Sequence, residues 1–179
     1  MLALLPDPQH RPTVLACDTS QQACSVALAL ADGNIIERLE ETGRGHTEKL
    51  PLMIADILES SGVGLQDLDR LGVTVGPGTF AGVRVGLAAM RAIRISHHLP
   101  IYPMTTTHAL ALPIQQMMQE DEARHCIVAI DARRGELYCQ IFDAQGRPVS
   151  EVMAHTPEAL VKIITKEGVS RSNIIGSGS

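Results

Sequence analysis

An internal repeat constrains the fold of this chain more than any other feature of its sequence. At an offset of 113 residues (131 − 18), Val14–Asp18 aligns with Ile127–Asp131 without a gap. The same offset aligns Gly33 with Gly146. Each copy reads as a buried strand that ends in an Asp and continues into a hairpin. A period this long is too great for a solenoid repeat, so we predict two related lobes.

The first copy is predicted to have the element order βββαβαβα. Strands are expected at 13–18, 23–30, 34–41, 71–75 and 101–104. The Asp32-Gly33 turn joins the second and third strands, and Gly62 ends the first helix. A second helix follows the glycine-rich segment and ends near Ser96, and a third covers about 107–118. Strands that alternate with helices through short loops predict an α/β fold with parallel later strands.

The second copy is predicted to be shorter than the first. Strands are expected at 127–131, 136–142, 149–154 and 173–175. Thr156 and Pro157 indicate the start of a helix, as its N-cap and first residue. The helix, strand and helix that complete the first copy have no counterpart in these residues. We therefore expect a flexible lead-in at 1–12, a first lobe at 13–120 and a second, incomplete lobe at 121–179.

The charge and the aromatic content exclude a solitary nucleic-acid binder. The chain has 15 Lys and Arg against 20 Asp and Glu, a net charge of −5. It therefore lacks the phosphate-neutralising surface that such a protein needs. Only 2% of the residues are aromatic and Trp is absent, which leaves few side chains that stack on bases. Any nucleic acid is expected to be held through a partner.

The cysteines and the apolar segments indicate a cytoplasmic protein with reduced thiols. The four cysteines are Cys17, Cys24, Cys126 and Cys139. They show no C-x-x-C spacing, which disfavours zinc and a thioredoxin-like centre, and we expect them to be free and buried. Residues 95–119 carry no Asp, Glu, Lys or Arg but contain three prolines, so no membrane span is predicted. The start of the chain lacks the basic region of a secretory signal.

Two lobes that each open on a hairpin with an Asp at the end of the first strand resemble the actin, hexokinase and Hsp70 (ASKHA) architecture. In that superfamily the hairpin amides hold nucleotide phosphates and the Asp organises a metal. Here the hairpin after Asp18 has no glycine at its bend, where the backbone would approach a phosphate. The turn after Asp131 has one glycine and two arginines. A structural role for Asp18 is favoured, and no cofactor is expected.

The segment Gly76–Arg84 is a second candidate for phosphate binding. Its glycines follow a predicted strand and open a predicted helix, where backbone amides and the helix N-terminus converge. It is not a Walker sequence. The alternative is a tight turn whose glycines let the helix approach the sheet, with Arg84 on the helix surface, and the sequence favours this alternative.

His46, just before the first helix, is the candidate metal ligand. In metalloenzyme relatives of this architecture, two His four residues apart on a helix bind metal. The residue four positions after His46 is Leu50, and a single His does not form such a site. A capping or surface role for His46 is favoured and no metal is expected. A G-x-S-x-G nucleophile motif does not occur either.

Four segments together resemble the bacterial TsaB (YeaZ) family. They are Val14–Ser20, Gly45–Glu48 ahead of a Leu-Pro helix, Gly76–Gly86 and Asp131–Tyr138. The glycine-rich segment and the Asp-x-Arg-x-Gly-Glu-x-Tyr segment are specific in combination, and their order and separation agree with the family. The resemblance covers nearly the whole chain from Thr13 onward, although family members usually complete the second lobe.

The resemblance implies a non-catalytic subunit that dimerises with TsaD, the related catalytic protein. That complex places a threonylcarbamoyl group on N6 of adenosine 37 in tRNAs that read ANN codons, and the ATPase TsaE joins the pair. A separate enzyme makes the carbamoyl-adenylate donor. We therefore expect tRNA to bind only through the complex and the chain by itself to be catalytically silent.

The resemblance also implies that the first two helices form the partner interface, in a helical bundle with TsaD or, in its absence, with a second copy. Small residues such as Ala88 on the second helix allow another helix to approach closely. The residues expected to face the partner are His46, Lys49, Leu52, Met53, Asp56, Arg84, Leu87, Ala88, Arg91 and Arg94. The alternative is that the small residues only fit the second helix against the sheet.

Two further functions stay open on the sequence alone. One is a nucleotide hydrolase of the actin-like superfamily, and the other is a metallopeptidase. Titration with ATP and with zinc separates them, because only the first should turn over nucleotide and only the second should bind metal tightly.

Overall fold

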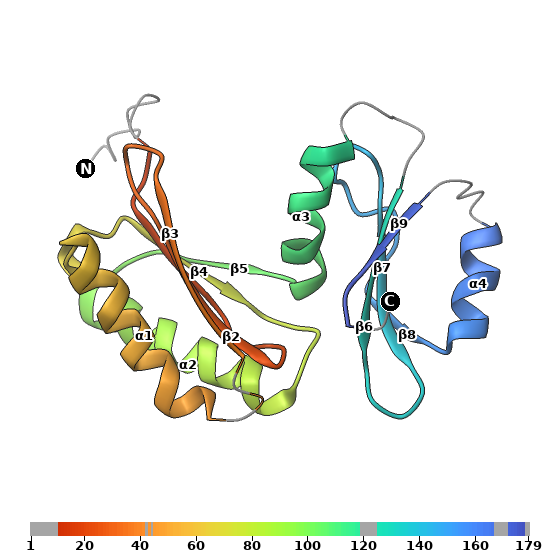
Figure 1. The fold of residues 1–179 in the computed structure, drawn as a ribbon, viewed down its shortest axis with the longest axis horizontal. Coiled ribbons are helices and arrows are strands. Elements are labelled where there is room, and N and C mark those ends of the chain that lie inside the picture. The colour runs from red at the N-terminus through yellow and green to blue at the C-terminus, as the bar shows by residue number, and fades with distance from the viewer. Residues whose placement is uncertain (1–10, 42, 44, 119–124, 167–171, 178–179) are drawn as a thin grey trace. The chain divides into compact units, whose positions relative to one another are not determined.

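The computed structural model describes residues 11–177 except 42, 44, 119–124 and 167–171. The chain forms two compact units. Unit 1 extends to Val75 and includes Thr79–Met104, and unit 2 consists of Gly76–Gly78 and the residues from Thr105 onward. Each unit has one β-sheet with helices beside it (Figure 1). The predicted class, an α/β chain of two lobes, is confirmed, while the lead-in falls almost wholly outside the described residues.

Unit 1 contains a five-stranded sheet with the order β3-β2-β1-β4-β5. Its elements are β1 (Val14–Asp18), β2 (Ala23–Ala29), β3 (Ile35–Glu41), α1 (His46–Ser61), η1 (Leu65–Asp67), β4 (Arg70–Thr74), α2 (Phe80–His97) and β5 (Ile101–Met104). β1 is antiparallel to β2 and parallel to β4, and β5 is parallel to β4. Parallel neighbours need a crossover connection, which α2 supplies between β4 and β5.

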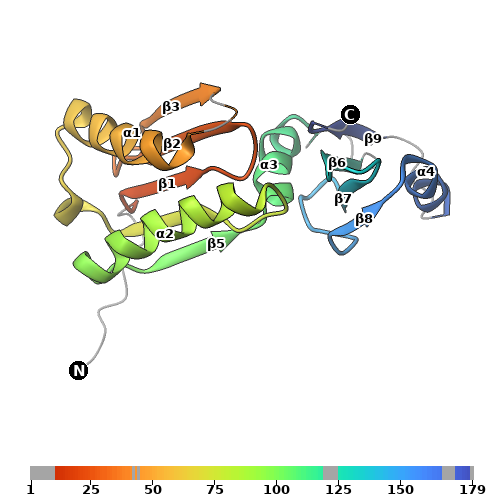
Figure 2. The ribbon, with the colours of Figure 1, turned by 90° about the horizontal axis from the view of Figure 1, so that it is seen from below.

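Alternating side chains distinguish the two faces of this sheet. In β2, Cys24, Val26 and Leu28 are buried, and the residues between them are half-buried. Helices α1 and α2 both lie on the side of the buried residues (Figures 1 and 2). The core between helices and sheet consists of Leu15, Cys17, Cys24, Val26, Leu28, Leu50, Met53, Ile54, Ile57, Leu68, Leu71, Val73 and Met90.

The ends of α1 and α2 follow from local sequence. Gly62 adopts a left-handed conformation with φ of +69° after α1, and its N–H bonds back to the last turn, so the predicted helix stop is confirmed. Thr79 caps α2, because its Oγ1 accepts a hydrogen bond from the N–H of Gly82 at 3.2 Å.

Unit 2 contains a four-stranded sheet with the order β8-β7-β6-β9. Its elements are α3 (Thr106–Met118), β6 (His125–Asp131), β7 (Leu137–Phe142), β8 (Met153–His155), α4 (Pro157–Lys166) and β9 (Ser172–Ile175). Thr156 Oγ1 accepts a hydrogen bond from the N–H of Ala159 at 3.3 Å, so the predicted cap of α4 is confirmed. The order of β6, β7, β8, α4 and β9 repeats that of β1, β2, β3, α1 and β4, which confirms the duplicated, ASKHA-like architecture with a shorter second copy.

The third strand of unit 2 is shorter than predicted. The sequence predicts a strand over 149–154, whereas β8 begins at Met153. Ser150 accounts for the difference. Its Oγ accepts a hydrogen bond from the N–H of Ile141 at 2.9 Å, and its carbonyl oxygen accepts one from Gln140 Nε2 at 3.2 Å. Val149 still donates a backbone hydrogen bond to the carbonyl oxygen of Ile141 at 2.9 Å, but at Ser150 side-chain bonds take the place of the backbone ladder.

Helix α3 packs in unit 2, whereas the predicted boundary at residue 120 assigns it to the first lobe. Ala111 of α3 is fully buried in one cluster with Phe142 of β7. At the start of the helix, Thr107 Oγ1 donates a hydrogen bond to Gln140 Oε1 at 2.5 Å, and both residues are buried. The helix is thus attached to the sheet that follows it in the sequence, and the boundary between the units lies directly after β5.

The hairpin that opens unit 2 is one residue shorter than the hairpin that opens unit 1. Asp18 pairs with Ser25, with six residues between them. Asp131 pairs with Leu137, with five residues between them. The offset of 113 residues therefore matches equivalent positions in β2 and β7. In β1 and β6 the same offset matches positions that are one residue apart. A slip of one residue turns every side chain of a strand to the other face.

The slip places Cys17 and Ile130 on different faces, so the prediction that they occupy equivalent positions is wrong. Cys17 belongs to the core under α1 and α2. Ile130 packs in the cluster of Ala111 on α3, while Ala129 packs with Leu160 of α4. Because α4 follows β8 as α1 follows β3, the residue equivalent to Cys17 is Ala129.

No helix in the part of the chain that the structure describes is both long enough and apolar enough to cross a membrane.

Candidate partner-binding face on helices α1 and α2

The glycine-rich segment brings the start of α2 against the end of β1. The buried Thr19 Oγ1 donates a hydrogen bond to the carbonyl oxygen of Gly82 at 2.7 Å and accepts one from the N–H of Gly86 at 3.1 Å. A Cβ at Gly82 would lie 2.0 Å from the Thr19 carbonyl oxygen, and one at Gly86 would lie 2.7 Å from Thr19 Oγ1. These two glycines therefore serve the packing of helix on sheet, which is the alternative that the sequence favours. Gly82 and Gly86 therefore lie on the side of α2 that faces the sheet, and not on the side where a partner helix is expected to approach.

The strand-end Asp of each unit is engaged by its own backbone. Asp18 Oδ1 accepts hydrogen bonds from the N–H of Ser20 at 2.7 Å and from Thr74 Oγ1 at 2.6 Å. In unit 2, Asp131 Oδ1 accepts a hydrogen bond from the N–H of Arg133 at 2.7 Å. Both are Asx turns that close the hairpin. This geometry supports the structural role favoured for Asp18.

His46 is buried at the first residue of α1, so the structure removes it from the predicted partner face. Its Nε2 lies 3.2 Å from the carbonyl oxygen of Gln22, just before β2. Gly45 has φ of +87°, a conformation that glycine adopts readily, and turns the chain into the helix at this point. Among the described residues, no three or more His, Cys, Asp or Glu side chains gather closely enough to hold a metal ion. The contact with Gln22 supports an anchoring role for His46.

Met53 is also predicted to face a partner, but it is buried in the core of unit 1 and only 5% exposed. It lies on the same stripe of α1 as the buried Leu50 and Ile57. The apolar stripe of a helix that packs on a sheet is at least about 100° wide, and Met53 falls inside it. Leu52, in contrast, is 69% exposed, as predicted.

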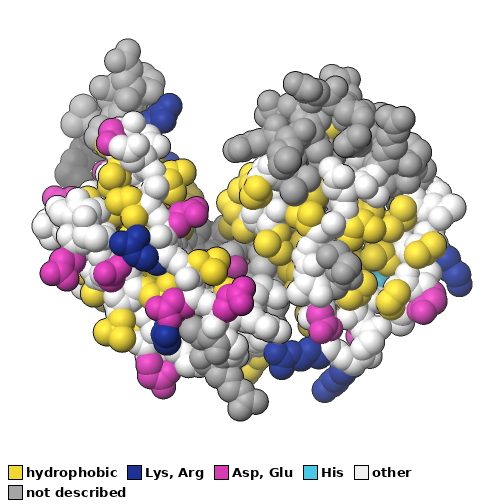
Figure 3. Space-filling model, viewed as in Figure 1, with side chains coloured by type: hydrophobic (Ala, Val, Ile, Leu, Met, Phe, Trp, Pro, Cys, Tyr) yellow, Lys and Arg dark blue, Asp and Glu magenta, His cyan; other side chains and the backbone are white. Residues whose placement is uncertain are grey.

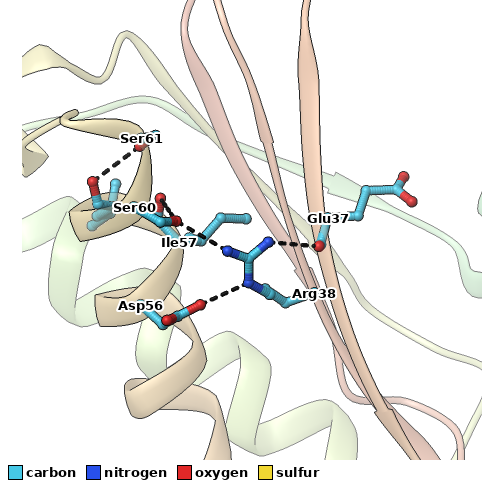
Figure 4. Close-up of polar contacts among 7 residues, drawn as sticks. Glu37, Arg38, Asp56, Ile57, Ser60 and Ser61 are labelled. Carbon is cyan, nitrogen blue, oxygen red and sulfur yellow. Dashed lines mark hydrogen bonds and ion pairs between the residues drawn. The ribbon is translucent and has the colours of Figure 1, made fainter.

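The charged residues predicted for the partner face of α1 are paired with β3. Lys49 forms an ion pair with Glu40. Asp56 accepts a hydrogen bond from Nε of Arg38 at 2.7 Å. Figure 4 shows the Arg38 side chain reaching from β3 to α1, where its Nη2 also donates a hydrogen bond to Ser60 Oγ at 3.0 Å. Lys49 and Asp56 therefore hold α1 against the edge of its own sheet.

Helix α2 presents the remaining predicted residues to the surface. Arg84, Ala88, Arg91 and Arg94 are exposed, whereas Leu87 is half-buried and packs against the core. The structure therefore places four of the five predicted α2 residues on one outward side of the helix.

Two exposed apolar residues of α2 are missing from the sequence prediction. Phe80 and Ile95 are each 73% exposed. The Arg84 guanidinium lies over the Phe80 ring, 3.5 Å from its centroid, in a cation–π contact. We define the α2 strip as Phe80, Arg84, Ala88, Arg91 and Ile95. These five follow one another at steps of three and four residues, so helical spacing alone identifies the whole strip.

The thiols of both units are free and buried, as predicted. Desolvation by burial raises the pKa of Cys17 to about 12, and the neighbouring Asp18 adds to the rise. Burial also raises the pKa of Cys126 and of Cys139 to about 11. A neutral, buried thiol is a poor nucleophile, so these side chains contribute to packing.

The chain is similar to proteins whose names refer to tRNA modification. The TsaD family model, described as tRNA N6-adenosine threonylcarbamoyltransferase, matches residues 38–173. The tRNA threonylcarbamoyladenosine biosynthesis protein TsaB of Escherichia coli (strain K12) is 38% identical over 125 residues, which are 70% of this chain and 52% of that protein. The protein of the same name from Haemophilus influenzae is 40% identical over 126 residues, with the same coverage of 70% and 52%. The chain thus spans about half the length of these relatives.

Two solved structures from Pseudomonas aeruginosa share the fold. One, described as YeaZ, matches with a TM-score of 0.72 and 32% identity, over 83% of this chain and 68% of that chain. The other, described as an uncharacterized protein with similarity to peptidase YEAZ, matches with a TM-score of 0.73 and 33% identity over the same shares.

Proposed function

This chain belongs to the TsaB (YeaZ) family, and on that basis we propose that it is a non-catalytic subunit of the complex that forms N6-threonylcarbamoyladenosine at position 37 of tRNA. Its proposed partner is a TsaD-type catalytic subunit, with a TsaE-type ATPase in the same complex. Two relatives that carry the name tRNA threonylcarbamoyladenosine biosynthesis protein TsaB support this reaction. In this proposal tRNA binds through the complex, and the protein acts in the cytoplasm.

The α2 strip is the observation that carries the proposal. Phe80 and Ile95 expose large apolar side chains at its two ends, and the small Ala88 between them lets a partner helix pack closely. Arg84 and Arg91 alternate with these residues, and aromatic and Arg side chains are enriched in protein interfaces. The strip therefore has the composition of a helix-packing interface.

The same strip is proposed to bind a second copy when the TsaD-type subunit is absent. A two-fold dimer uses one patch on both copies, so Arg84 and Arg91 of one copy approach those of the other. The positive charges of these arginines repel one another across the interface, and added salt screens the repulsion. We therefore expect a weak homodimer that tightens as salt is raised and that gives way to the complex with TsaD.

Sedimentation velocity tests the proposed interface with the substitution Ala88→Glu. This change places a longer, charged side chain at the centre of the strip, on a surface that tolerates it in the folded monomer. We expect both the homodimer and the complex with a TsaD-type subunit to be lost, with an unchanged circular dichroism spectrum. Val161→Glu is the matched control, because Val161 is also on a helix and 62% exposed, but in unit 2. Normal assembly of the Ala88→Glu protein would contradict the proposal.

The surroundings of Asp18 support the non-catalytic role over that of a nucleotide hydrolase. Its Oδ1 is already shared between Ser20 and Thr74, and the hairpin that follows contains no glycine. ATP turnover by the purified chain is expected to stay at the level of a buffer blank, and zinc titration is expected to show no tight binding. Turnover that disappears in an Asp18→Asn variant would favour the hydrolase instead.

A further inference from the structure

The turn of the β6–β7 hairpin carries two arginines at positions that disfavour them. Arg133, Arg134 and Gly135 follow one another with positive φ angles of 55°, 99° and 77°. Glycine adopts this left-handed conformation readily, whereas a residue with a Cβ does not. Disfavoured backbone conformations are concentrated at functional sites. A glycine would turn the chain here more easily than Arg134 does, so the arginine indicates a role beyond the turn.

The side chains of both arginines are available to a ligand. Arg133 and Arg134 are exposed. No acidic side chain of the described residues pairs with either guanidinium, whereas Arg38 and Arg147 each form an ion pair. The backbone N–H of Arg133, in contrast, already donates a hydrogen bond to Asp131 Oδ1 at 2.7 Å. A ligand at this turn is therefore bound by the guanidinium groups and not by that amide.

The corresponding hairpin of unit 1 shows that a turn at this place does not require charge. Its residues between Asp18 and Ser25 include no charged side chain, and Thr19 and Ser20 at its start are buried. In unit 2 the turn is exposed and basic. Figure 3 shows Lys and Arg side chains at the end of unit 2 where the β6–β7 hairpin turns in Figure 1. The two copies thus differ in the chemistry of this turn.

The turn lacks the apolar centre that protein interfaces have. None of the large apolar residues that the structure shows as exposed lies between Asp131 and Leu137, whereas Phe80 and Ile95 supply such a centre in the α2 strip. The turn also has no aromatic side chain that could stack on a base. Guanidinium groups bind phosphate oxygens through paired hydrogen bonds. The turn therefore fits the phosphate backbone of a nucleic acid.

Acidic residues at the base of the turn limit how strongly it binds. Asp131 ends β6, and Glu136 directly precedes β7. Together with Arg133 and Arg134 they make the turn neutral overall. Two phosphate contacts beside two carboxylates are too weak to hold RNA alone. This agrees with the net charge of −5, which excludes a solitary nucleic-acid binder.

We propose that Arg133 and Arg134 contact backbone phosphates of the tRNA while the complex with the TsaD-type subunit holds it. This inference rests on the proposed function and adds a contact that the chain itself makes with the tRNA. Contacts to phosphate fix the position of a nucleic acid and carry no sequence information. The contact therefore positions the tRNA and is the same for every tRNA that the complex binds.

The salt dependence of tRNA binding tests the inference. The complex of this chain with a TsaD-type subunit is titrated with fluorescently labelled tRNA at increasing KCl, and binding is followed by anisotropy. Each phosphate contact steepens the fall of log K with log salt. Arg133→Gln and Arg134→Gln should each reduce this slope by about 1 and weaken binding at low salt. Arg147→Gln is the control, because Arg147 is in the same unit but paired with Asp143, and it should leave the slope unchanged.

Arg134→Gly separates the charge from the fold. Glycine relieves the backbone strain at φ of 99°, so thermal unfolding of this variant should occur at an equal or higher temperature. Its tRNA binding should nevertheless weaken as in Arg134→Gln. Unchanged tRNA binding by a stable Arg134→Gly protein would overturn the inference.

The remaining outcomes distinguish this inference from the proposed function. If the unaltered chain forms no complex that binds tRNA, both are wrong. If the complex binds tRNA and the slope stays the same in Arg133→Gln and Arg134→Gln, only this inference is wrong. Loss of the complex itself in these variants, seen by sedimentation, would mean that the turn binds a protein. ATP binding by the isolated chain that disappears in Arg133→Gln would mean that it binds a nucleotide, and either result overturns the inference.

Discussion

Units 1 and 2 share one strand order but differ on the face that lies opposite the first helix of each copy. In unit 2 this face carries Val128, Ile130 and Phe142 beneath α3. In unit 1 the same face carries residues such as Ala16 and Ala29, and the helices pack on the other side. The duplicated topology is thus compatible with two ways of burying a sheet.

The largest effect that sharpens this comparison is expected from Phe142→Ala. The ring is fully buried and lies 5.4 Å from the ring of His108 on α3. Its removal should lower the free energy of unfolding of unit 2 by about 3–5 kcal/mol, because it leaves a cavity under the helix. Hydrogen exchange at the β6 and β7 amides measures this loss.

The matched change in unit 1 is Ala29→Phe, at the equivalent position. It adds a ring to the face of the unit 1 sheet opposite α1 and α2, where no helix of unit 1 that the structure describes would be displaced. We expect a change within about 0.5 kcal/mol, as for most surface substitutions. A loss as large as that of Phe142→Ala would break the comparison.

The next largest effect is expected from Gly82→Ala in unit 1. The new methyl group would lie 2.0 Å from the Thr19 carbonyl oxygen, so α2 must move away from β1. Overpacking of this kind costs about 1–3 kcal/mol. Urea unfolding measures it.

Gly135→Ala in unit 2 is the control for the Gly82 variant. Gly135 has φ of +77°, and nothing lies within 4 Å of the position of its Cβ. Its replacement costs only the backbone strain of a left-handed conformation, about 1 kcal/mol. A Gly135 variant less stable than the Gly82 variant would contradict the packing role assigned to Gly82.

A smaller effect is expected from Arg38→Ala, which removes the bonds from β3 to α1. Arg38 and Asp56 are 37% and 60% exposed, and water screens such pairs, so the loss should be about 0.2–1 kcal/mol. In unit 2, Arg147→Ala provides the comparison, because Arg147 pairs with Asp143 at 2.8 Å within one turn. Thermal unfolding in low and high salt should show a loss that shrinks with salt for both variants. A loss independent of salt would contradict the ion-pair account.

The smallest effect is expected from a thiol reagent at neutral pH. The buried thiols of both units have a pKa above their ordinary value of 9.0, about 12 for Cys17 and about 11 for Cys126. They should therefore stay unlabelled by an aromatic disulfide until the protein unfolds. Because the folded-state pKa is raised, the stability from these neutral thiols is complete below pH 9 and is lost as the pH rises toward 11–12. Rapid labelling of the folded protein at pH 8 would contradict the burial.

The sequence predicts the elements well because their signals are local. Alternation along the strands, the Gly62 stop and the Thr156 cap lie within a few residues of the structures that they determine. The length of the hairpin, in contrast, is not predicted. An Asp ends the first strand in both copies, and an alignment on these two residues needs no gap. It therefore does not show that the hairpin between Asp18 and Ser25 has one residue more than the hairpin between Asp131 and Leu137.

The residues of the predicted partner face also divide into those with a local sequence signal and those without one. Helical spacing on α2 alone places Arg84, Ala88 and Arg91 on one side, and the structure agrees. On α1, the partners of Lys49 and Asp56 lie on β3, 9 and 18 residues earlier in the sequence. Such tertiary pairs leave no periodic signal, so the sequence does not show that these charges are already compensated.

One reconstituted reaction tests the central claim, that the α2 strip supplies assembly while the chain supplies no chemistry. Threonylcarbamoyladenosine on tRNA is measured by mass spectrometry, with a TsaD-type and a TsaE-type subunit present. Asp18→Asn retains the oxygen that accepts the Ser20 and Thr74 bonds, so product formation should stay near that of the unaltered chain. Ala88→Glu should reduce it to the level seen without this subunit. Full product with Ala88→Glu, or loss of product with Asp18→Asn in a folded protein, would contradict the account.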